Sequence, residues 1–125
     1  MAHTVYEGAE AVWSGSLVDT SSDGITALTR LTLTYYDQQT GRVINSRSAQ
    51  NILCTAFGST NANVIVSSSG LLTWRLQPED NVIVSADLPA GAPEVHIALF
   101  QWGWNSSAYS GAAEEVFACY QRSKI

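Results

Sequence analysis

The longest apolar run of the chain, at residues 94–104, restricts the possible folds more than any other stretch. It is too short to cross a bilayer as a helix, which takes about 20 apolar residues, and its aromatic and β-branched side chains favour a strand. Side chains alternate between the two faces of a strand. One face would carry Val95, Ile97 and Leu99, and the other Glu94, His96, Ala98, Phe100, Trp102 and Trp104. Because both faces are largely apolar, the run predicts a central strand that is covered on both sides.

Shorter runs elsewhere also alternate with a period of two. Leu31, Leu33 and Tyr35 share one face of their run, and threonines occupy the other. Turn-forming residues separate such runs about every ten residues, as in all-β domains, and no segment shows a helical stripe. The strands that we expect lie at residues 25–37, 42–46, 64–66, 71–76, 81–85, 94–104 and 115–120, with short candidates at 3–7 and 11–14. The pattern predicts an all-β fold, an antiparallel β-sandwich of about seven to eight strands that is either immunoglobulin-like (Ig-like) or jelly-roll-like.

The length of 125 residues is that of one domain. We expect residues 25–125 to form a single β-sandwich domain and residues 1–24 to form an N-terminal arm or edge strand. Alternation along the expected strands also predicts which side chains fill the core. They are Leu33, Leu72, Trp74, Leu76, Val95, Ile97 and Leu99.

The N-terminal segment is apolar in places, but glycines and polar turns interrupt it. Its apolar side chains are Val5, Tyr6, Val12 and Trp13. Such a segment can be stabilised by adding to the sheet edge of a neighbouring molecule, and the same contact repeated around an axis gives a closed homo-oligomer. We therefore expect assembly through this segment, and we expect a truncation that lacks residues 2–13 to fold without assembling.

Charge excludes some classes of partner. Charged residues make up 14% of the chain, against about 25% in typical soluble domains, and the net charge is −5. An acidic chain gains no affinity for nucleic acid from counterion release, so no nucleic-acid partner is expected. We see no signal peptide and no membrane segment, and we expect synthesis in a cytoplasm. Cys54 and Cys119 show no metal-binding spacing and are expected to be buried free thiols, with a disulfide as the alternative.

Motifs for catalysis, cofactors or metals are missing from the sequence. Glu94 and His96 would share a strand face and could act as acid and base, but the chemistry needs a third group and a pocket, and the sequence shows neither. A hydrogen-bonded core histidine is the simpler interpretation. Residues 19–24 are the nearest approach to a calcium loop but lack its closing glutamate. We therefore predict no enzyme activity, no cofactor and no metal site.

The aromatic stripe at the end of the long run is the strongest candidate for a functional surface. It consists of Phe100, Trp102 and Trp104. Exposed tryptophans anchor protein partners or stack on sugar rings, whereas buried ones would fill the space between two sheets. Together with Val5, Tyr6, Val12 and Trp13, these residues form the candidate interface.

Three stretches of the chain together resemble a family of small bacteriophage virion proteins encoded among head and tail genes. The stretches are LTLTYYD (31–37) with TGRVIN (40–45), GLLTWRLQPEDN (70–81) and EVHIALFQW (94–102). The resemblance implies a β-sandwich that decorates a capsid or joins head to tail, located in the virion and bound to a major capsid, neck or tail protein. It implies no enzyme activity. The alternatives are a carbohydrate-binding β-sandwich that uses exposed tryptophans and, third, a small hydrolase.

Overall fold

The fold is all-β, as the alternating runs predict. The structure is a computed structural model. It describes residues 2–16, 28–53, 60–66, 71–85, 88–89, 91–104 and 109–121. These residues form nine strands and one short 3₁₀ turn. No helix within them is long and apolar enough to span a membrane.

The larger sheet contains five strands in the order β1-β9-β8-β3-β4. Their bounds are β1 His3–Tyr6, β3 Leu28–Asp37, β4 Gln50–Asn51, β8 Glu94–Trp104 and β9 Tyr109–Tyr120. Strand β8 is the long apolar run, and it pairs antiparallel with β3 on one side and β9 on the other. The run is therefore a central strand. At the edge of the sheet, β1 runs parallel to β9.

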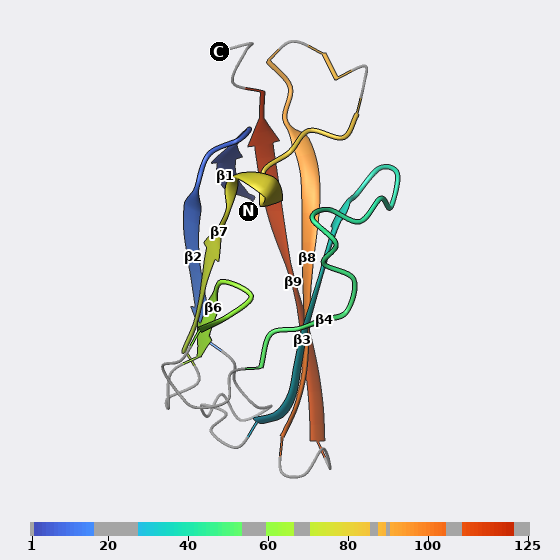
Figure 1. Cartoon of the computed structure of the whole chain (residues 1–125). Coiled ribbons are helices and arrows are strands. Elements are labelled where there is room, and N and C mark those ends of the chain that lie inside the picture. The colour runs from blue at the N-terminus through green and yellow to red at the C-terminus, as the bar shows by residue number, and fades with distance from the viewer. Residues whose placement is uncertain are drawn as a thin grey trace.

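The smaller sheet contains four antiparallel strands in the order β2-β7-β6-β5. Their bounds are β2 Ala11–Ser16, β5 Thr60–Asn61, β6 Val64–Val66 and β7 Leu71–Leu76. Figure 1 shows β2, β7 and β6 as one layer, with β3, β8 and β9 forming the other. The 3₁₀ turn η1 (Pro78–Asp80) follows β7 directly, where Pro78 ends the strand because proline cannot donate to a ladder.

The strand order is that of an Ig-like sandwich. Strands β2, β7 and β6 take the places of strands B, E and D, and β3, β8 and β9 those of C, F and G. Antibody domains join B to F by a disulfide. Here Trp13 of β2 stacks on Phe100 of β8, with ring centroids 5.1 Å apart and planes 12° apart. An aromatic pair thus links the two sheets where the disulfide would stand.

The core lies between the facing surfaces of the two sheets. Leu33, Leu72, Trp74 and Leu76 are fully buried there, as predicted. The prediction for β8 was wrong about the face. Its core side chains are Ala98, Phe100 and Trp102, whereas Val95 and Leu99 are only half-buried. Ile97 is buried on the outer face, beside its cross-strand neighbours in β3 and β9.

Three segments differ from their predicted structure. Residues 42–46 make a single bridge, from Val43 to Tyr36, and no strand, because Asn45 and Ser46 adopt left-handed backbone angles that turn the chain. Residues 81–85 are not a strand either; the amides of Val84 and Ser85 bond to a glutamate side chain instead of a neighbouring strand. Residues 48–53, where no strand is predicted, contain the short strand β4.

The described part of the N-terminal segment, residues 2–16, supplies an edge strand to each sheet. β1 extends the larger sheet beside β9, and β2 extends the smaller one beside β7. Val5 belongs to the core. The expectation that this segment needs a neighbouring molecule's edge is therefore corrected, since the chain's own sheets supply the main-chain partners. Removing residues 2–13 would take an edge from both sheets, so the truncation would no longer leave an intact sandwich.

Candidate functional site

A polar cluster of three residues lies at one end of the sandwich, on the inner face of the larger sheet. Asp37 ends β3, and Glu94 and His96 begin β8. Asp37 pairs directly with His96 in the β3–β8 register, so both side chains point to the same face, which Glu94 shares because it stands two residues from His96. All three are buried. We call this group the carboxylate–histidine cluster.

Glu94 is held by hydrogen bonds from three directions. Its Oε1 accepts from the amide of Val84 at 2.9 Å and lies 2.8 Å from Nε2 of His96, and its Oε2 accepts from the amide of Ser85 at 2.8 Å. Burial alone would raise the pKa of this carboxyl, but the bonds from His96 and the two amides outweigh it and leave the pKa below its usual value. Glu94 is thus a carboxylate that fixes the path of residues 84–85.

His96 is fully buried, and both of its ring nitrogens have partners. Nε2 lies beside Glu94, and Nδ1 lies 3.3 Å from the hydroxyl of Tyr35. Burial raises the pKa of Tyr35 well above its usual value, so this hydroxyl stays protonated. When Nε2 donates to Glu94, Nδ1 of the neutral ring accepts from Tyr35. With no exposed nitrogen, His96 is poorly placed for acid–base catalysis on a substrate.

Asp37 is oriented by the turn that follows it. Its Oδ2 accepts from the backbone amide of Thr40 at 3.0 Å and from the Thr40 hydroxyl at 2.6 Å. Gly41, with φ of 75°, then donates its amide to the Asp37 carbonyl and closes the turn. Within the described part of the chain, nothing donates to Oδ1 of Asp37. That oxygen remains available to a ligand.

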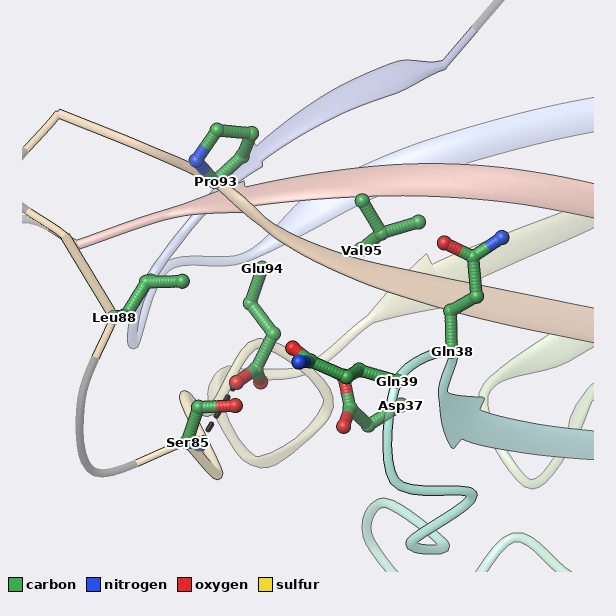
Figure 2. A pocket seen from close by; sticks show the side chains of 8 residues that line it. All are labelled: Asp37, Gln38, Gln39, Ser85, Leu88, Pro93, Glu94 and Val95. Carbon is green, nitrogen blue, oxygen red and sulfur yellow. Dashed lines mark hydrogen bonds between the residues drawn. The ribbon is translucent and has the colours of Figure 1, made fainter.

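A cavity of about 320 Å³ opens beside the cluster. Its lining includes Asp37, Gln38, Gln39, Ser85, Leu88 and Glu94. Figure 2 shows the carboxylates of Asp37 and Glu94 pointing into the same space from β3 and β8. The sequence pairs Glu94 with His96 but offers neither a third group nor a pocket; the structure supplies Asp37 and this cavity. Sequence reasoning missed Asp37, the last residue of the expected strand 25–37, because only the β3–β8 register reveals that it lies beside His96.

Cys119 of β9 lies directly opposite Glu94 in the sheet and is a buried free thiol. Cys54, its possible disulfide partner, lies outside the described residues. Burial raises the pKa of Cys119 to about 12, and the carboxylates of Glu94 and Glu7 add to this effect. Because the thiolate is the reactive form, the native thiol should be inert.

In a Cys54→Ser variant, we expect Cys119 to react with a thiol reagent at least ~100-fold more slowly in the native state than in urea, since both burial and the raised pKa suppress the thiolate. The rate of absorbance change at neutral pH measures this. Complete labelling of the native variant within minutes would contradict the burial of Cys119.

A second polar group, also missed by sequence reasoning, is a buried ion pair between the sheets. Arg47 donates from Nε and Nη2 to the two carboxylate oxygens of Asp80. It also donates to Gln50 at 2.6 Å and lies over the ring of Trp74, 5.4 Å from its centroid. Asn45 completes the set by donating to Asp80 at 2.9 Å. These hydrogen bonds join η1 to the turn after β3.

The seven residues of the candidate interface do not form one surface. Val5, Phe100 and Trp102 are buried in the core, so they cannot contact a partner in this fold; Trp102 is 5% exposed, and its indole covers Gly111 of β9. Tyr6 and Val12 are exposed, and Trp13 is half-buried against Phe100. The side chain of Trp104 lies outside the described part of the structure. Phe100 and Trp102 of the aromatic stripe therefore pack the core.

An exposed apolar surface does exist, on the outer face of the smaller sheet. Val12 is 63% exposed, Leu71 43% and Ile65 39%. Register brings Val12 of β2 opposite Arg75 of β7, and Ile65 of β6 opposite Thr73 of β7. A hollow of about 250 Å³ is lined by Val12, Ile65, Thr73 and Arg75, with Asn63 beside them. We call Val12, Ile65, Leu71, Thr73 and Arg75 the smaller-sheet patch.

Neither the carboxylate–histidine cluster nor the smaller-sheet patch can be assigned by similarity. Comparison with protein-family models, with curated proteins and with solved structures found no match.

Proposed function

We propose that this protein is a non-enzymatic structural component of a phage particle, a capsid decoration or head–tail protein, and that it binds its protein scaffold through the smaller-sheet patch. The observation that carries the proposal is the exposure of Val12, Leu71 and Ile65 on one sheet face. The fold and the resemblance of its β3, β7 and β8 stretches to virion proteins agree with this role. Several copies on one scaffold would each use the same patch.

The patch has the composition of a protein interface. Arg75 stands opposite the aliphatic Val12, and arginine is among the residues that most often dominate binding energy at interfaces. Single exposed apolar residues are ordinary on protein surfaces, but a group of them beside a hollow indicates a contact site. In a chain with a net charge of −5, the positive charge of Arg75 favours a partner that presents an acidic group to an apolar surface.

A carbohydrate-binding role has less support. It requires flat, exposed tryptophans on which sugar rings can stack. Trp74 and Trp102 are buried, and Trp13 stacks on Phe100. Every tryptophan side chain that the structure describes thus packs in the core or against it.

The test is co-sedimentation of the purified full-length protein with purified phage particles. Val12→Asp places a charge in the patch at a position that is exposed, so folding should be retained, and binding should weaken at least ~10-fold, as charge insertion at the centre of an apolar contact does. Thr4→Asp, on the exposed side of β1, is the matched control and should bind like the wild type. Light scattering after size-exclusion chromatography reports whether free copies also associate.

Two outcomes would count against the proposal. If the wild type does not co-sediment with particles, the virion role is wrong. If it does, and Val12→Asp binds as well as Thr4→Asp, the contact lies elsewhere on the molecule.

A further inference from the structure

The potential metal-ligand atoms of the carboxylate–histidine cluster lie close enough together to bind one ion. One carboxylate oxygen each from Asp37 and Glu94 and one ring nitrogen of His96 lie within 4.8 Å of one another. A zinc ion has bonds of about 2.0–2.2 Å and therefore holds tetrahedral ligands about 3.4 Å apart. Small rotations of the three side chains would shorten the distances between these atoms to the spacing that zinc requires. The neighbouring cavity of about 320 Å³ leaves room for water as a further ligand.

Among the described residues, the basic group that contacts a carboxylate of the cluster is His96, itself a member of the cluster. Within the described part of the chain, neither Asp37 nor Glu94 forms an ion pair with an arginine or a lysine. Arg47, which is buried, donates to Asp80, Gln50 and Ala62 instead. Burying carboxylates is unfavourable unless hydrogen bonds, an opposite charge or a cation compensate, and one bound cation would compensate both carboxylates. Oδ1 of Asp37 accepts no hydrogen bond from any described residue and belongs to a side chain that lines the cavity.

We propose that Asp37, Glu94 and His96 bind a divalent transition-metal ion, with Zn²⁺ as its representative. Two carboxylates and one imidazole form a mixed oxygen and nitrogen donor set. Such a set suits Zn²⁺ or Mn²⁺ better than Ca²⁺ or Mg²⁺, which prefer oxygen ligands alone. The ion would join the end of β3 to the start of β8 beside the segment that contains Val84 and Ser85.

Each ligand already has a second partner that orients it. Thr40 holds Oδ2 of Asp37, and the amides of Val84 and Ser85 hold Glu94. For Nε2 of His96 to bind the ion, its proton moves to Nδ1, which then donates to the Tyr35 hydroxyl 3.3 Å away. Metal-bound histidines usually donate their second ring N–H to an oxygen acceptor, a role that the hydroxyl oxygen of Tyr35 would fill. The ion replaces the bond between His96 and Glu94 with a bond to each of them.

The experiment uses the full-length protein after EDTA treatment and dialysis, with ZnCl₂ added in a calorimetric titration and a thermal melt. We expect one Zn²⁺ per chain and a rise in melting temperature, because an ion that binds the folded state alone stabilises it. Asp37→Asn keeps the size of the side chain and should weaken Zn²⁺ binding at least ~10-fold. Glu114→Gln, exposed on β9, removes the same charge from the same sheet and should bind like the wild type.

A second measurement does not depend on a variant of the cluster. The chain has two histidines, so Co²⁺ in place of Zn²⁺ should shift the imidazole proton signals of one of them in an NMR spectrum, and the shifted signals should persist in His3→Gln. The proposal is overturned if Zn²⁺ does not bind, if Asp37→Asn binds as well as Glu114→Gln, if the shifted signals vanish in His3→Gln, or if Ca²⁺ stabilises the protein and Zn²⁺ does not.

Discussion

Asp80→Asn should lower the free energy of unfolding by about 3–5 kcal/mol, the usual result of removing one partner from a buried ion pair. The variant leaves the guanidinium of Arg47 buried, with no carboxylate to neutralise it. Its remaining partners, the side chain of Gln50 and the carbonyl of Ala62, are uncharged. Trp74 lies under the guanidinium, but a cation–π contact contributes only about 0.5–2 kcal/mol. Urea melts followed by circular dichroism measure the loss.

The double variant Arg47→Met/Asp80→Asn, compared with the two single variants, measures the interaction between Arg47 and Asp80. Removing both charges also removes the cost of burying them, so its loss should be smaller than the sum of the two single losses. Glu79→Gln is the control, since Glu79 neighbours Asp80 in η1 but is exposed, and its effect should stay within about 0.5 kcal/mol. Additive losses, or a loss below about 1 kcal/mol for Asp80→Asn, would show that this ion pair does not hold the two sheets together.

Those parts of the fold that depend on local chemistry could be predicted from the sequence. A period of two along residues 31–36 and 71–76 needs no knowledge of the partner strand, and both runs are strands with the predicted faces. The inner face of β8 could not be predicted in this way. Both of its faces are apolar, and the second sheet decides which becomes core. Phe100 is selected because it meets Trp13 and Trp74 across the interface.

The polar groups could not be predicted because their partners are far apart in the chain. Arg47 and Asp80 are separated by 33 residues, and His96 and Tyr35 by 61. Neither separation corresponds to a local motif, and β3 and β8, which carry Tyr35 and His96, become neighbours only through the strand order of the larger sheet. One local signal was present. Asp37 followed by Thr40 and Gly41 is typical of a turn that an aspartate side chain caps, which would have marked Asp37 as the oriented end of its strand.

Trp74→Ala should lower the free energy of unfolding by about 3–5 kcal/mol, the range for truncating a large aromatic side chain in a core. Trp74 is fully buried at the centre of the sandwich. Its ring makes edge-to-face contacts with Tyr35 at 5.1 Å, Phe117 at 5.6 Å and Phe100 at 6.1 Å between centroids. These residues belong to β3, β9 and β8, so one side chain of the smaller sheet contacts three strands of the larger one.

The cavity left by Trp74→Ala cannot close easily, because the surrounding rings are fixed by their own strands. Trp74→Ala also removes the aromatic ring beneath Arg47. The substitution should therefore affect the buried ion pair, and the losses of stability caused by Trp74→Ala and Asp80→Asn should not be additive when the two are combined. Val12→Ala, on the exposed face of the same sheet, is the control and should change stability by less than about 0.5 kcal/mol. Far-UV circular dichroism in urea is the measurement, because it does not depend on the tryptophan that is removed. A loss below about 1 kcal/mol for Trp74→Ala, outside the range for core aromatics, would place Trp74 at the periphery and would mean that the two sheets do not pack through it.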